Sequence, residues 1–127
     1  MITLKNSELA NKNKNISPAL FKISQLETLS GELKYKVTKV LKAYKDAIDN
    51  MGANFQTEVL QKFQDGLDDK GQPNIPEEKM DDFKAAQIAY GEIAVTLACE
   101  KLSHEELLKV DKITPEMVVG LEYLTDM

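Results

Sequence analysis

The sequence predicts an α+β fold, predominantly α-helical, in one domain covering residues 1–127. In this fold a long helix and an antiparallel partner helix form a hairpin beside a small two-stranded sheet and short C-terminal helices. Three observations lead to this prediction: a long apolar stripe at helical spacing, two short alternating segments, and cap residues placed before apolar runs.

The N-terminal residues "MITLKN" predict a strand, because two apolar side chains alternate with two polar ones. Asn6 is then expected to cap a short helix, since an asparagine side chain can accept from the first free backbone donors. A second helix is expected to start at Ser17 and Pro18. Proline suits the first helical position because the N–H that it lacks has no partner there.

The strongest pattern predicts a long helix from about Glu32 to Gln64, following Ser30-Gly31. Its apolar residues recur at alternating steps of four and three and share one stripe: Val37, Leu41, Tyr44, Ile48, Met51 and Phe55. After Phe55 the steps become four and four, so the apolar face of an α-helix would rotate there.

Gly52, just before the rotation, is expected to mark a bend or break. Leu60 lies off the stripe and is expected to be exposed. The stripe is interpreted first as a seam that packs an antiparallel helix of the same chain. The alternative is that its rotated end, with Leu60 and Phe63, belongs to a dimer or partner surface.

The stretch "DDKGQPNIPEE" could be an acidic metal loop or a joint between two helices. A calcium loop with Gly71 at its sixth position would start on Gly66, which has no carboxylate, and would place Lys70 at its fifth position, where calcium needs an oxygen ligand. A joint fits better, because Gly71 supplies the left-handed conformation of a tight turn. Asn74 and Glu77 then form a capping-box-like start for the next helix.

That next helix is expected to run from Pro76 to Tyr90. The following "GEIAVTLA" fits either a strand or a continued helix. We favour a strand at residues 93–97, paired with the N-terminal strand, because β-branched residues follow Gly91. Near the C-terminus, "SHEE" is a capping box and "TPE" is a second helix start.

The amino-acid composition argues against two kinds of function: recognition that depends on arginine, and direct binding of nucleic acid. All sixteen basic residues are lysine, so sites that need the planar fork of arginine are not expected. Residues 1–50 hold nine lysines against five acids, whereas residues 51–127 hold seven lysines against sixteen acids. This acidic part would repel phosphates, so direct binding of nucleic acid is not expected.

The sequence predicts no catalytic, cofactor-binding or metal-binding residue, so we expect no cofactor and no enzymatic activity. The single Cys99 and the single His104 cannot build a four-ligand zinc site, and they fall across a predicted strand-to-helix boundary. The N-terminus has no apolar core typical of a secretion signal, and no run of about eighteen apolar residues occurs. A cytoplasmic protein without membrane contact is expected.

The C-terminal half resembles a family of small uncharacterised proteins of tailed bacteriophages and prophages. The shared features are a D-x-x-G-x-P turn and a terminal I-[ST]-P-x-x-L-x-x-L-E-x-L helix. The residues that fit are Asp68, Gly71, Pro73, Pro76, Phe83, Thr114, Pro115, Leu121 and Glu122. The sequence departs from the pattern at Val119, around Ser17–Ser30 and in a longer "ACEKL" segment. The resemblance implies a viral origin, action in the host cytoplasm and an interaction role.

We therefore expect a small non-enzymatic, phage-encoded adaptor or host-interaction protein that binds another protein, with a homodimer as one option. The alternative is an acidic inhibitor that mimics nucleic acid and occupies a host nucleic-acid enzyme or defence complex, as an anti-CRISPR does. The candidate interaction residues are Leu60, Phe63, Asp65, Asp68, Asp69, Glu77, Glu78, Asp81 and Asp82.

Overall fold

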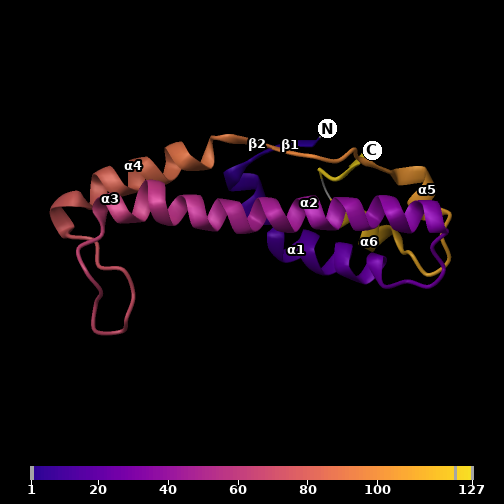
Figure 1. The fold of residues 1–127 in the computed structure, drawn as a ribbon, viewed down its shortest axis with the longest axis horizontal. Helices are drawn as coiled ribbons and strands as arrows, with labels where there is room; N and C mark the ends of the chain where they lie inside the picture. The colour runs from indigo at the N-terminus through magenta and orange to yellow at the C-terminus, as the bar shows by residue number, and fades with distance from the viewer. Residues whose placement is uncertain (1, 122, 127) are drawn as a thin grey trace.

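A single long helix, α2 (Gly31–Phe55), spans the length of the molecule and serves as its spine (Figure 1). Ser30 caps its start, since the Ser30 hydroxyl oxygen accepts from the Leu33 N–H at 3.2 Å. The helix continues directly into the π-helix η1 (Gln56–Leu60) and then α3 (Gln61–Phe63). The predicted extent of the long helix is confirmed, and no break occurs at Gly52. The computed structural model describes residues 2–121 and 123–126.

Helix α1 (Asn6–Ser24) packs along the first half of α2. The prediction of two helices here, with a restart at Ser17 and Pro18, is wrong, because the helix runs straight through Pro18. The interior proline removes one backbone hydrogen bond. One apolar face continues on both sides of it and is fully buried at Leu9, Ile16, Leu20 and Ile23. Burial of that face outweighs the local cost of the proline.

The predicted two-stranded sheet is confirmed. Strands β1 (Ile2–Lys5) and β2 (Ala94–Leu97) pair antiparallel, with Ile2 opposite Leu97 and Lys5 opposite Ala94. The sheet joins segments from opposite ends of the chain. The pairing extends one step further, since the Asn6 N–H donates to the Ile93 carbonyl at 3.0 Å.

The C-terminal segment folds into short elements beside α1 and the first half of α2 (Figure 1). Strand β3 (Leu102–Ser103) leads into α5 (His104–Leu108), and α6 (Pro115–Val119) precedes β4 (Thr125–Asp126), which pairs parallel with β3. Both predicted caps form: the Ser103 and Thr114 hydroxyl oxygens accept from the N–H groups of Glu106 and Met117. The small parallel sheet was not predicted.

Beyond Phe55 the chain forms an arm, residues 56–91, made of η1, α3, a loop, η2 (Glu77–Lys79) and α4 (Met80–Gly91). Helix α4 runs back antiparallel to the spine and packs against η1, which is the predicted partner-helix arrangement (Figure 1). We call the remainder of the described chain the body.

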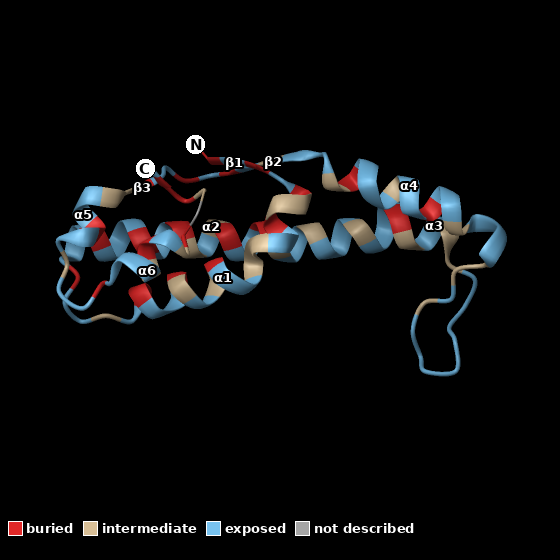
Figure 2. Ribbon diagram, turned by 180° about the vertical axis from the view of Figure 1, so that it is seen from behind, coloured by how far each residue is buried: buried red, intermediate tan, exposed pale blue. Residues whose placement is uncertain are grey.

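Buried residues are concentrated in the body (Figure 2). The body core joins α1, α2, the strands and the C-terminal helices, whereas a separate cluster in the arm centres on Val59, Phe83 and Tyr90. Along α2 the buried positions are Leu33, Val37, Val40, Tyr44 and Ala47, because α1 and the C-terminal segment cover this helix from two sides. Within residues 2–121 and 123–126, no helix has the length and apolar character needed to cross a membrane.

Candidate functional site: an acidic arm

The arm begins with a π-helix, and this helix type fits the spacing of the apolar residues there. Phe55, Val59 and Phe63 are each four residues apart, which would carry them around an α-helix. A π-helix forms hydrogen bonds to i+5 and so holds more residues in each turn. The wider turn Gln56–Leu60 counteracts the rotation, and Val59 is buried while Phe55 and Phe63 are half-buried against α4.

Aromatic contacts hold α4 against α3 and against the end of α2. The Phe63 and Phe83 rings meet edge to face with centroids 5.8 Å apart, and the Phe55 and Tyr90 rings lie 5.5 Å apart. The Tyr90 hydroxyl donates to the Met51 carbonyl at 2.8 Å. Burial, together with the charge of Glu58, raises the pKa of Tyr90.

Leu60 and Phe63 therefore belong in part to the arm's own core. Leu60, expected to be exposed, is half-buried, because its side chain packs against the arm cluster at the end of η1. Both side chains keep part of their surface accessible. That a partner protein binds Leu60 and Phe63 stays a prediction.

The loop between α3 and η2 projects away from the rest of the molecule (Figures 1 and 2). It is a small hairpin in which the Asp68 N–H donates to Gln72 and the Gly71 N–H donates to Asp68. Leu67 and Pro73 form a bridge across it. Gly71 has a positive φ of 77°, as the turn prediction requires.

The carboxylate of Asp68 is used inside this hairpin, where it accepts from the backbone N–H groups of Lys70 and Gln72, both at 2.9 Å. The predicted cap at Asn74 is wrong. The Asn74 side chain instead donates to the Asp65 carbonyl at 3.3 Å and closes the base of the loop, while η2 begins without a side-chain cap.

The predicted acidic residues are all exposed. Asp65, Asp68 and Asp69 lie on the loop, Glu77 and Glu78 on η2, and Asp81 and Asp82 in the first turn of α4. Residues 64–82 hold these seven acids and only two lysines. Leu67, which the sequence interpretation overlooked, is 65% exposed among them. The only sequence signal for it was a single apolar residue inside an acidic turn.

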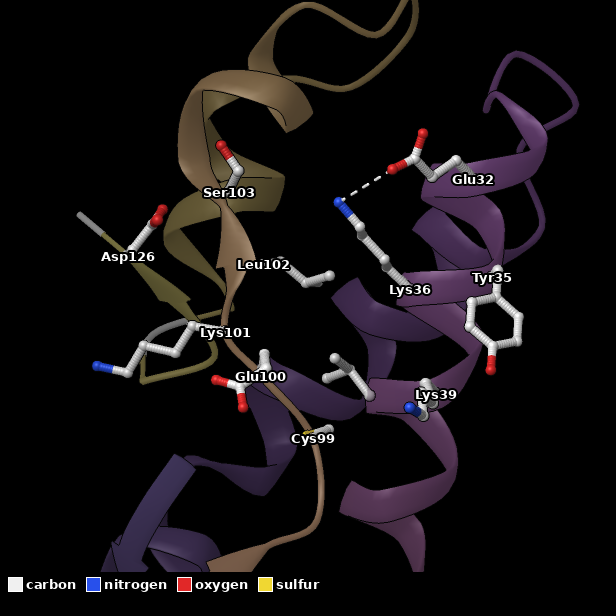
Figure 3. Close-up of a pocket in the computed structure, with 11 residues that line it drawn as sticks. Glu32, Tyr35, Lys36, Lys39, Cys99, Glu100, Lys101, Leu102, Ser103 and Asp126 are labelled. Atoms are coloured by element: carbon white, nitrogen blue, oxygen red, sulfur yellow. Dashed lines mark ion pairs between the residues drawn. The ribbon is translucent and has the colours of Figure 1, made fainter. Parts of the chain in front are cut away.

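A groove of about 550 Å³ lies on the body, between the first half of α2 and residues 99–103 (Figure 3). Both walls mix charges: α2 contributes Glu32, Lys36 and Lys39, and the opposite wall contributes Glu100, Lys101 and Asp126. The Lys36 ammonium lies 3.6 Å from a Glu32 carboxylate oxygen and 3.8 Å from one of Glu106. Lys36 is thus held by two carboxylates of the chain itself, which weakens its attraction for an outside anion.

Cys99 also lines this groove but is only 6% exposed. Burial, and then the charge of Glu100, raise the pKa of the Cys99 thiol, so the reactive thiolate is disfavoured near neutral pH. His104 is half-buried at the first position of α5. Across residues 2–121 and 123–126, no three or more His, Cys, Asp or Glu side chains are grouped so that they could hold a metal ion.

Compared with known proteins, the chain matches no protein-family model, no curated protein and no solved structure. The resemblance to phage proteins stays a prediction.

Proposed function

We propose that this chain is a small non-enzymatic protein, phage-encoded as the resemblance implies, that binds another protein through its acidic arm. The observation that carries the proposal is the placement of seven exposed carboxylates on a projecting loop and the adjoining helix start. A surface of this kind attracts a basic partner over a distance and orients it before contact.

Apolar area within the same region supports a protein as the partner. Leu67 is exposed at the loop, and Leu60 and Phe63 are half-exposed nearby at the end of the spine. Protein interfaces combine a small apolar centre with a polar or charged rim. Leu67 would supply the centre, with the carboxylates around it.

A second candidate function is inhibition of a host nucleic-acid-binding enzyme or defence complex. The excess of acids over lysines in residues 64–82 favours it, because an array of carboxylates can occupy a surface built for phosphates. The two functions differ in the partner: a nucleic-acid-binding protein that releases its nucleic acid on binding, or a protein without such a site.

The proposal can be tested by affinity capture from bacterial lysate with three forms of the chain, before and after nuclease treatment. One form is native. The arm-neutralised variant carries Asn or Gln at Asp65, Asp69, Glu77, Glu78, Asp81 and Asp82; Asp68 is kept because its carboxylate builds the hairpin. The control variant removes the same number of negative charges elsewhere, at Glu27, Asp46, Asp49, Glu105, Asp111 and Glu116.

We expect the native and control chains to capture the same protein at low salt and the arm-neutralised chain to lose it. If the captured protein is a nucleic-acid-binding enzyme, and its capture persists after nuclease treatment of the lysate, the result favours the inhibitor function. Capture of the same protein by all three forms contradicts the proposal. A second copy of the chain as the retained protein would instead identify a homodimer.

A further inference from the structure

The groove on the body is bordered by one edge of an extended segment. Residues 99–103 run along it, with Asp126 of β4 on one side of the segment and α2 on the other (Figure 3). The Leu102 N–H faces β4, because it donates to the Leu124 carbonyl at 2.8 Å. Successive residues of an extended chain turn their backbone groups to opposite edges. The N–H and the carbonyl of Lys101 therefore face the groove.

Lys101 offers an open backbone edge at this point. Among residues 2–121 and 123–126, no group accepts from its N–H and none donates to its carbonyl. Lys101 is exposed and lines the groove, so a ligand that enters the groove lies beside these two groups. An unpaired edge of this kind is a template on which another extended chain can add a strand.

The charges of the groove indicate which ligand side chain fits beside Lys101. Most charged groups of the lining interact within the chain: Lys36 with Glu32 and Glu106, Lys39 with the Tyr35 ring, Asp126 with the His104 N–H, and Glu100 likewise. The Lys101 ammonium, in contrast, has no ion-pair partner in the part of the chain that the structure describes. Its positive charge favours a ligand that carries a carboxylate.

The geometry of an added strand places the side chains of the ligand. An antiparallel residue opposite Lys101 exchanges two hydrogen bonds with it, which satisfies both of its backbone groups at once. The side chain of that residue lies on the same face as the Lys101 side chain, where a carboxylate forms an opposite-charge pair with the ammonium. The ligand residues before and after it turn to the face of Leu102, which belongs to the body core, and apolar side chains suit that face.

We propose that this groove binds an extended segment of another protein, which adds as an antiparallel strand along Lys101. The segment presents a carboxylate to the Lys101 ammonium and has an apolar residue on each side of the acidic one. The inference does not depend on the acidic arm, because the groove lies on the body and its lining includes no residue of the arm.

The backbone pairing can be tested with the peptide acetyl-Thr-Val-Glu-Val-Thr-amide and two methylated forms. N-methylation of its Glu removes the donor to Lys101, whereas N-methylation of its second Val removes an N–H that points away from Lys101. Binding is followed by amide chemical shifts of the labelled protein during titration. We expect saturable shifts centred on Lys101 and Ser103. The methylated Glu should weaken binding about tenfold and the methylated Val should change it little. Equal affinity of the two methylated forms, or no saturable shift with the parent peptide, overturns the proposal.

A charge exchange tests the register. Lys101→Glu should weaken binding of the parent peptide about threefold or more, and should favour a peptide with Lys in place of Glu. Lys109→Glu is the matched control, because Lys109 is equally an exposed lysine but does not line the groove. Both substitutions are on the surface, and amide spectra report whether the fold is intact. The same affinities for both peptides in the two variants would refute the assignment of the carboxylate to Lys101.

Discussion

At the scale of single residues, Tyr44 ties the two main helices of the body together. It is 1% exposed, and its hydroxyl donates to the Asn13 side-chain oxygen of α1 at 2.7 Å. Loss of this bond in Tyr44→Phe should lower the free energy of unfolding by about 1 kcal/mol. Urea unfolding measures the change. Tyr35→Phe is the control, because Tyr35 is 66% exposed and should change little; equal losses in the two variants would contradict this role for Tyr44.

The burial of Tyr44 makes the free energy of unfolding depend on pH in the alkaline range. It raises the pKa of Tyr44 to about 12, against an ordinary value near 10 in the unfolded chain. Between these values the unfolded chain releases a proton that the folded chain keeps. The stabilisation is complete below pH 10 and falls as pH rises toward 12.

Unfolding at several pH values between 9 and 12, in native protein and Tyr44→Phe, checks this dependence. We expect the decline in stability with pH to be shallower in the variant, because one of the groups responsible is gone. An identical decline in both would show that Tyr44 ionises normally.

Caps at Ser103 and Thr114 were predictable because each depends on a few neighbouring residues. The caps expected at Asn6 and Asn74 did not form. The Asn6 side chain instead donates to the Tyr90 carbonyl, 84 residues away, and this partner is set by tertiary packing, which a local pattern does not contain. The Asn74 side chain donates to the Asp65 carbonyl within its own loop, where the closing of the hairpin competes with the cap.

At the scale of elements, the long helix and the pairing of β1 with β2 followed from periodicity. Strands β3 and β4 did not, since two residues each are too short to carry an alternating pattern. The continuity of α1 did not follow from the sequence, because Ser17-Pro18 is a typical helix start, whereas in the fold the apolar face of α1 is buried on both sides of Pro18. The four-and-four spacing predicted that the apolar face would rotate after Phe55. It did not predict that a π-helix would form there and counteract the rotation.

The arm should open more easily than the body. Its cluster has Val59, Phe83 and Tyr90 as buried residues, whereas the body core is much larger. Phe83→Ala should therefore raise hydrogen exchange of amides in α3 and α4 and leave that of α1 nearly unchanged. Leu20→Ala, at a fully buried position of α1, is the comparison and should speed exchange throughout. An equal rise in arm and body for Phe83→Ala would show that they unfold as one unit.

At the scale of the whole molecule, the excess of acids is concentrated in the arm, where residues 64–82 hold seven acids and two lysines. At the opposite end of the spine, the five lysines of residues 31–45 are accompanied by Glu32 and by Glu105 and Glu106 of α5, which lies at that end (Figure 1). An excess of acids confined to one end orients an approaching basic protein. The sequence could predict this concentration of acids, because the positions of charges along a helix and a loop follow directly from the order of residues.

The fold class was predictable for a related reason: the helices and the main sheet arise from repeated local patterns. The candidate surface was predictable only in its charges. The exposure of Leu67 and the partial burial of Leu60 depend on how the hairpin and the π-helix are formed.

The most direct test of an acidic binding arm is the association rate of the captured partner with the native, arm-neutralised and control chains, measured at low and high salt. We expect the arm-neutralised chain to associate at least about tenfold more slowly at low salt and to lose most of its salt dependence, while the control stays close to native. An arm-neutralised chain that binds with the native rate and the native salt dependence would contradict the account.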